Sequence, residues 1–251
     1  MHRRHKKPYA VIFVVVVALV IFGALRDMDL VKNPPPPERS AMRMHYADDA
    51  NDFEKLPRDT SPVMIRIGTA APQADGTYQL TTSDITPITL PQREVGLAII
   101  VKGDIPAAFA DFNRMVEEQV NVWKRKNNKI SEILIEWEAD AADVEKLATL
   151  AVALRTYLKQ DYLIGITLQR KWFDKTPMPA AWQEKFPLGI RDYIYDIHEA
   201  KREGETITDT LTALEAVGIP FLIRTNEAPD EKQALALMDA HQKFLGFVVI
   251  R

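Results

Sequence analysis

The feature that most constrains the fold is an alternation of short strand-like runs with longer helical patterns, which begins at Pro62. Alternation of this kind favours parallel strands joined by crossover helices. We predict eight strands, at residues 63–68, 78–82, 95–102, 130–138, 163–169, 190–198, 221–226 and 247–251. The chain is therefore expected to belong to the α/β class.

Amphipathic helices are expected to cover this sheet. Apolar residues at helical spacing, together with start and stop signals, predict helices at residues 106–127, 141–159, 179–186, 207–217 and 230–244. Eight strands suggest a (β/α)8 barrel, but residues 62–251 number only 190, where about 250 is typical. No helix fits between the first two strands. We therefore predict a reduced or irregular (β/α)8 TIM-like barrel, with an open doubly wound sheet as the alternative.

A run without charged residues precedes this domain, at residues 9–25. At 1.5 Å per residue it reaches about 26 Å as a helix, which is the short end of a bilayer span. A basic tip at residues 1–8 precedes the run and two aspartates follow it, so the N-terminus is expected to stay inside. We predict a single transmembrane anchor in a bacterial inner membrane, with residues 1–8 cytoplasmic and the C-terminal domain periplasmic. A cleaved signal peptide is the alternative.

The segment between the anchor and the domain, residues 26–61, is predicted to be a tether. It contains four consecutive prolines, which stiffen a chain because each ring fixes φ and removes a backbone donor. The alternative is that parts of residues 41–56 form a helix packed on the domain.

Composition excludes several classes of function. The chain has no cysteine, which excludes a disulfide scaffold, a cysteine nucleophile and a thiolate metal site. Its five histidines show no metal-binding spacing, and no nucleotide-binding or serine-hydrolase motif occurs, so we predict neither a metal nor a cofactor. Residues 27–251 hold 27 basic against 35 acidic side chains, and a net charge of −8 argues against nucleic acid as a partner.

Barrels of this kind carry their chemistry at the C-terminal ends of the strands. The strand that ends Ile135-Glu136-Trp137-Glu138 alternates, so Glu136 and Glu138 are expected to point into the barrel with their Cα atoms roughly 6.6 Å apart. Two carboxylates that close raise the pKa of one of them, which keeps it protonated as a general acid. We predict Glu138 as the catalytic acid and Glu136 as its neighbour. The alternative is a structural layer in which Arg224 and Lys102 pair with Glu136 and Glu138.

Other strand ends supply side chains suited to a sugar. Amides, carboxylates and guanidinium groups bond hydroxyls, and an indole can stack on the face of a ring. The predicted substrate-binding residues are Gln169, Trp172, Asp196, His198, Arg224 and Asn226.

The strand at residues 131–138 resembles the catalytic strand of glycoside hydrolase family 18, whose motif reads Asp-x-x-Asp-x-Asp-x-Glu. Glu138 stands at the acid position and Glu136 at the neighbouring aspartate position, while Ser131 and Leu134 replace the two earlier aspartates. The resemblance implies an acid that protonates the glycosidic oxygen while the acetamido group of the substrate attacks.

A closer resemblance runs from Val95 to Trp172. It is to an uncharacterised bacterial domain family of glycoside-hydrolase-like TIM barrels, in which an acid-x-acid strand precedes a helix with a Leu-Arg pair and then a strand that leads to a tryptophan. The matching residues here are Glu136, Glu138, Leu154, Arg155, Ile166, Thr167, Leu168 and Trp172. The resemblance implies a barrel and an envelope setting.

Two hypotheses about function follow. In the first, the domain binds or processes an envelope glycan in a glycoside-hydrolase-like site, with catalysis retained or lost. In the second, a barrel without catalysis serves as an envelope accessory or scaffold protein through protein contacts. An open cleft at the strand ends would favour the first hypothesis. A filled barrel mouth with an exposed apolar patch would favour the second, because large patches usually mark interfaces.

Overall fold

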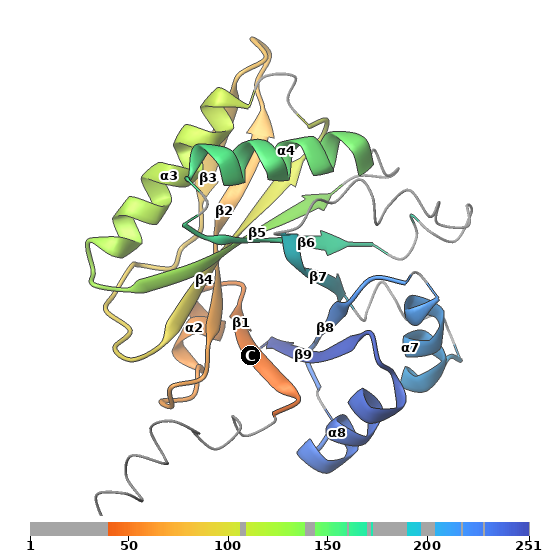
Figure 1. Cartoon of the computed structure of the whole chain (residues 1–251). Coiled ribbons are helices and arrows are strands. Elements are labelled where there is room, and N and C mark those ends of the chain that lie inside the picture. Colours follow the sequence, from red (N-terminus) through yellow and green to blue (C-terminus); the bar gives the residue numbers. More distant parts are fainter. Residues whose placement is uncertain are drawn as a thin grey trace, which may run out of the picture. The chain divides into compact units, whose positions relative to one another are not determined.

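The computed structural model describes residues 40–105, 109–138, 144–159, 161–169, 172, 190–196, 204–216, 218–227 and 229–250. These residues form a curled sheet of nine strands in the order β1-β9-β8-β7-β6-β5-β4-β2-β3 (Figure 1). The strands are β1 (Met42–Ala47), β2 (Val63–Pro72), β3 (Tyr78–Thr82), β4 (Glu94–Lys102), β5 (Lys129–Glu138), β6 (Leu163–Leu168), β7 (Ile190–Asp196), β8 (Phe221–Thr225) and β9 (Phe244–Ile250).

Strand β1 pairs with the strands at both ends of the row of parallel strands. This strand pairs in parallel with β9 on one side and with β2 on the other, so that His45 is in register with both Val249 and Val63. By contrast, β3 runs antiparallel to β2 and lies outside this arrangement. The sheet therefore encloses an inner face, and the side chains of alternate residues point into it.

A glycine allows β9 to approach β1 closely. Gly246 has φ +127°, and a Cβ added there would lie 2.4 Å from the carbonyl oxygen of Ala41. The next residue, Phe247, donates its amide to that same oxygen at 2.7 Å. Only glycine combines this backbone conformation with so short an approach.

The predicted fold class, a reduced or irregular (β/α)8 TIM-like barrel behind a single N-terminal transmembrane helix, is corrected by the structure. The described residues contain five helices rather than one after each strand, and β3 is antiparallel. No helix among them is long and apolar enough to cross a membrane, and the predicted anchor at residues 9–25 lies outside them. The structure instead has an α/β fold. Its curled, mainly parallel sheet has a TIM-barrel-like form.

The N-terminal part of this sheet comes from residues 40–61, which belong to the segment predicted to be a tether. They contain β1 and the short helix α2 (Ala50–Glu54), which begins where the Asp49 side chain accepts a hydrogen bond from the Asp52 amide. Strand β1 has no β-branched residue, so it carries little of the usual strand signal. The folded domain therefore begins earlier in the chain than predicted.

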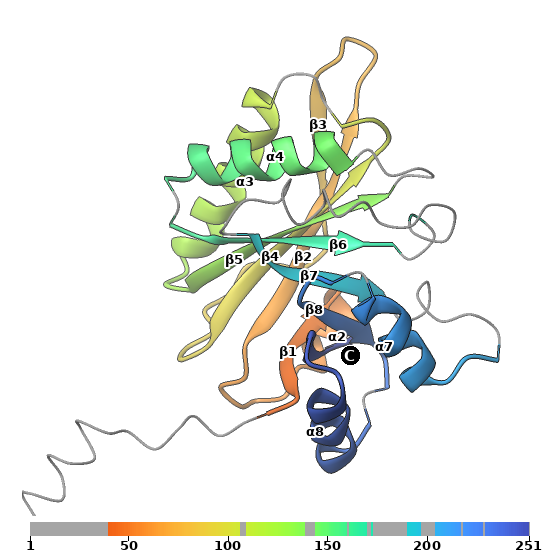
Figure 2. The same cartoon turned by 45° about the vertical axis from the view of Figure 1, so that its right-hand side comes forward.

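Helices α3 (Ala110–Lys124) and α4 (Val144–Tyr157) cover the outer face of the sheet near β4, β5 and β6 (Figures 1 and 2). Helices α7 (Ile207–Glu215) and α8 (Glu231–Ala240) follow β7 and β8 in the chain. All four lie within predicted helical ranges, whereas the helix predicted at residues 179–186 lies outside the described residues.

The sheet has an outer and an inner core. On β5, Ile133, Ile135 and Trp137 belong to the outer core under the helices, whereas Leu134 belongs to the inner core. This confirms the alternation predicted for that strand. The inner core comprises Tyr46, Met64, Ala98, Leu134, Leu222 and Val248.

Candidate functional site

The candidate site is at the C-terminal ends of the strands, where β5 ends with the carboxylates of Glu136 and Glu138. Glu136 is 7% exposed, while Glu138 ends the strand with half of its side chain in solvent. The two side chains share a face, as predicted, but their surroundings differ.

Glu136 is held by two donors from distant strands. The Tyr46 hydroxyl of β1 donates to its Oε1, and the Arg224 guanidinium of β8 donates to its Oε2 at 2.7 Å. The Arg224 guanidinium also lies 4.8 Å from the centre of the Tyr46 ring. A buried carboxylate is tolerated when it has a cation and hydrogen bonds, and Glu136 has both.

Tyr46 is suited to its role as donor. Its side chain is 1% exposed, and this burial is the main reason that its pKa lies well above the ordinary value. The negative charge of Glu136 raises the pKa further, against a smaller lowering effect from Arg224. The phenol therefore remains protonated and keeps donating to Glu136.

Glu138 has a cation of its own. The Lys102 ammonium of β4 lies 3.4 Å from Glu138 Oε2, and both side chains are about half exposed, at 55% and 50%. The two ion pairs named in the alternative interpretation, Arg224 with Glu136 and Lys102 with Glu138, are both present. The two carboxylates are thus separately compensated rather than held as a pair of like charges.

Strand β6 brings two buried polar side chains beside this network. Thr167 is in register with Glu136 and is 5% exposed, and Gln169, just beyond the strand, is 7% exposed. Gln169 donates its Nε2 to the Trp137 carbonyl at 3.3 Å, which leaves its Oε1 facing elsewhere. Neither the Thr167 hydroxyl nor Gln169 Oε1 has a hydrogen-bond partner among the described residues. The site therefore contains two buried oxygens that have no hydrogen-bond partner among the described residues.

The structure places the remaining predicted residues apart from this cluster or on its border. Trp172 is 8% exposed and its ring centre lies 5.5 Å from that of Trp137, so it packs in the outer core. Asn226 is exposed just past β8. Asp196 is in register with Arg224 at the end of β7. His198 lies outside the described residues.

Sequence reasoning missed two members of the site. Tyr46 was missed because β1 was assigned to the tether, although the spacing of Met44 and Tyr46 is that of one strand face. Thr167 was recognised in the family resemblance and as sharing a strand face with Gln169, but it was not among the predicted substrate-binding residues. Its position opposite Glu136 follows from the strand register, which a single sequence does not contain.

Within the described ranges, no group of three or more His, Asp or Glu side chains could hold a metal ion. No protein-family model matches the chain, and no curated protein matches it. The two resemblances noted in the sequence stay predictions, and function is inferred from the geometry.

Proposed function

We propose that the C-terminal end of the curled sheet binds an envelope glycan, and that the domain acts by binding rather than by hydrolysis. The observation that carries the proposal is the pair of buried, unengaged oxygens of Thr167 and Gln169 beside the Glu136 network. Buried polar atoms are normally hydrogen-bonded, and leaving one unsatisfied costs about 1–3 kcal/mol. A ligand rich in hydroxyl groups supplies the missing partners.

The charges around these oxygens suit the same ligand. The Lys102–Glu138 pair is half exposed at the strand ends, and Arg66 of β2 forms a second pair with Asp48 at 2.6 Å. Paired charges are close to neutral overall and offer both donors and acceptors to hydroxyl groups. The envelope setting itself rests on the resemblance described in the sequence analysis.

Binding is favoured over hydrolysis by the state of the two carboxylates. Glu136 is committed to Tyr46 and Arg224. A general acid is kept protonated by burial or by a neighbouring negative charge, whereas Glu138 is half exposed and lies next to an ammonium group. The geometry therefore supports a glycan anchor at Glu138 better than a proton donor.

The alternative role as a scaffold has no comparable support. Among the described residues, the exposed large hydrophobic side chains are Ile88, Val152 and Tyr157. They come from a loop and from helix α4, and single exposed apolar residues are ordinary on a soluble surface.

The test uses a threonine whose hydroxyl is not engaged. Thr167→Val in the full-length chain removes that hydroxyl and little else, so it should weaken binding by about tenfold, or about 1.4 kcal/mol. Chitotetraose and peptide-free glycan strands of peptidoglycan serve as probes in isothermal titration calorimetry. Because no protein hydrogen bond is lost, the free energy of unfolding should stay the same or rise.

The matched control is Thr210→Val, which removes a buried hydroxyl that donates to the Thr206 carbonyl. It should lower stability and leave glycan affinity unchanged. The proposal fails if neither glycan binds the wild-type chain, or if Thr167→Val binds as tightly as wild type. Release of new reducing ends from either glycan would instead restore the hydrolytic interpretation.

A further inference from the structure

The turn between α3 and β5 is strongly basic. Residues 124–129 contain no acidic side chain and four exposed cations, namely Lys124, Arg125, Lys126 and Lys129. A fifth exposed cation, Lys159, lies in the turn that leads from α4 to β6. Both turns are at the end of the sheet where the strands begin, opposite to the proposed glycan site. We call these five residues the basic cluster.

Side-chain contacts hold the backbone of the basic cluster in place. Lys124 donates to the hydroxyl of Tyr162 at 3.2 Å, and this tyrosine directly precedes β6, so the two turns lie together. The buried Asn128 donates to the Ile88 carbonyl and accepts from the Leu90 amide, both at 2.8 Å. The turn is therefore tied to its neighbours on both sides, and its cations project from a fixed backbone.

Nearby acidic residues compensate only part of this charge. Glu94 pairs with Lys129, and Asp161 is an exposed acid in the other turn. Among the described residues, Arg125 and Lys126 have no ion-pair partner. Cations at the end of α3 suit the helix dipole, but that effect falls off within the last turn and does not account for a cation on β5. The cluster thus keeps an excess of positive charge.

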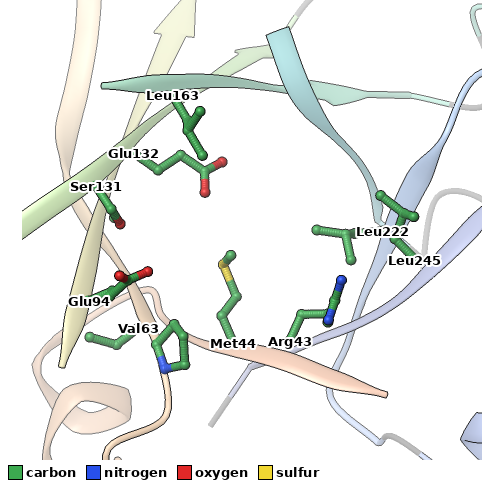
Figure 3. A pocket seen from close by; sticks show the side chains of 11 residues that line it. Arg43, Met44, Val63, Glu94, Ser131, Glu132, Leu163, Leu222 and Leu245 are labelled. Atoms are coloured by element: carbon green, nitrogen blue, oxygen red, sulfur yellow. The ribbon is translucent and has the colours of Figure 1, made fainter. Parts of the chain in front are cut away.

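Two more exposed cations extend this positive end toward the first strands. Arg58 lies in the segment before β2, and Arg43 lies on β1. Figure 3 shows Arg43 at a cavity of about 220 Å³, across the opening from Glu94. Exposed cations therefore stand near the beginnings of β1, β2, β5 and β6.

The domain as a whole is acidic, which makes this end distinctive. Residues 40–251 hold 25 basic against 32 acidic side chains, a net charge of −7. In the part of the chain that the structure describes, acidic residues stand at the opposite end, at or just after the ends of β1, β2, β4, β5 and β8. They are Asp48, Asp75, Asp104, Glu138 and Glu227. A charge separation of this kind orients a protein with its positive end toward an anionic surface.

The N-terminal segment joins the domain at the same positive end. Ser40 is the first described residue and lies just before β1, where the Ala41 amide donates to Glu231 Oε1 at 2.8 Å. Residues 1–39 include the uncharged apolar run at residues 9–25. Residues 26–39 reach at most about 50 Å when fully extended. The positive end is thus the end through which the domain is connected to an apolar segment.

We propose that this end of the sheet contacts an anionic lipid surface, with the basic cluster on the phosphates of the headgroups. Ammonium and guanidinium groups donate charge-assisted hydrogen bonds to phosphate. Each Lys or Arg near such a surface strengthens binding by roughly fivefold. The same surface repels the acidic end, so the C-terminal ends of the strands face away from the lipid.

The experiment places one fluorophore at either end of the full-length chain. The chain has no cysteine, so Asn121→Cys and Ala74→Cys each create a single labelling position. Residue 121 is exposed near the end of α3, beside the basic cluster, and residue 74 is exposed in the turn between β2 and β3. Quenching by a spin label on the lipid headgroup reports contact at that residue. A contribution of residues 1–39 to vesicle binding is common to all variants.

Vesicles of phosphatidylcholine are compared with an about two-to-one mixture of phosphatidylcholine and phosphatidylglycerol. Residue 121 should be quenched at least about threefold more in the mixed vesicles, and residue 74 equally weakly in both. Salt at about 1 M, where the screening length is about 3 Å, should remove the difference. The triple variant Arg125→Gln, Lys126→Gln, Lys159→Gln should also remove it, because three cations contribute on the order of 100-fold in affinity.

The matched control removes three exposed cations from other places. Arg114→Gln, Lys146→Gln, Lys232→Gln changes residues in the first halves of α3, α4 and α8, and should keep the difference. Circular dichroism checks the fold of both triple variants.

Three results overturn the proposal. They are equal quenching of residue 121 in the two kinds of vesicle, quenching of residue 74 as strong as that of residue 121, and equal behaviour of the two triple variants. An acidic protein or a nucleic acid as the partner would give the first of these results. Thr167→Val should leave headgroup contact unchanged, so a failure of the glycan proposal is recognised separately.

Discussion

Tyr46 and Arg224 meet inside the curled sheet, with the guanidinium 4.8 Å from the centre of the phenol ring. They come from β1 and β8, and both donate to the carboxylate of Glu136 on β5. A stacked guanidinium contributes about 0.5–2 kcal/mol beyond its hydrogen bonds. The three side chains therefore connect strands that are far apart in the sheet. Substitutions at these positions are expected to change the stability of the protein.

Removal of the Glu136 charge should destabilise the protein strongly. In Glu136→Gln the buried Arg224 loses its carboxylate, which should lower the free energy of unfolding by on the order of 3 kcal/mol. Chemical denaturation near neutral pH measures this change in the free energy of unfolding. Glu138→Gln is the control, because its half-exposed pair with Lys102 should contribute no more than about 1 kcal/mol. Equal effects of the two variants would contradict this assignment.

Tyr46→Phe should change how stability depends on alkaline pH. Burial raises the pKa of the folded-state phenol well above its unfolded value of about 10, so the protonated form is favoured by folding. Its contribution is fully present below about pH 10 and is lost as the pH rises toward the folded pKa. The stability difference between wild type and Tyr46→Phe should therefore shrink above about pH 10. A constant difference in denaturation measured across this range would refute the prediction.

Gly246→Ala should weaken the junction between β9 and β1. The added Cβ meets the Ala41 carbonyl oxygen at 2.4 Å in a backbone conformation with φ +127°, so a cost on the order of 3 kcal/mol is expected. Gly76→Ala is the control, since φ is +80° there but a Cβ meets nothing within 4 Å. It should cost only about 1 kcal/mol. Thermal unfolding of both variants distinguishes steric contact from backbone strain.

Trp172→Ala should behave as a core substitution. Because Trp172 is 8% exposed and packs on Trp137, its truncation should cost at least about 3 kcal/mol, with most of the loss restored in Trp172→Phe. A stacking platform for sugar would give the opposite pattern, with unchanged stability and lost chitotetraose binding. Denaturation and calorimetry on the same two variants decide between these roles.

Much of the fold follows from local sequence patterns. The alternation on β5 correctly predicts which residues lie outward and inward, and the apolar stripe of α3 correctly predicts its buried side through Phe112, Val116 and Trp123. Both patterns are set by the repeat of a single element, so one sequence contains them. The bounds of the predicted helices are longer than those observed, as is common at helix ends.

The rest depends on contacts that sequence spacing does not encode. The position of strand β1 is set by its pairing with β9 and β2. Its own sequence has too weak a strand pattern to predict that position. The pairing of Glu136 with Arg224 was foreseen as an alternative, but Tyr46 was absent from it. Trp172 follows its strand where loops begin, and only the three-dimensional packing places it against Trp137.

The position of β1 between β2 and β9 also bears on how the protein is made. β1 is among the first strands to leave the ribosome, and β2 follows soon after, so that pairing can form early. Its other neighbour, β9, is the last of the described strands to be synthesised. Until then one edge of β1 stays open beside the inner cluster of Tyr46 and Met64. An unpaired strand edge can pair with another chain, so this edge of β1 is open to aggregation until β9 is in place.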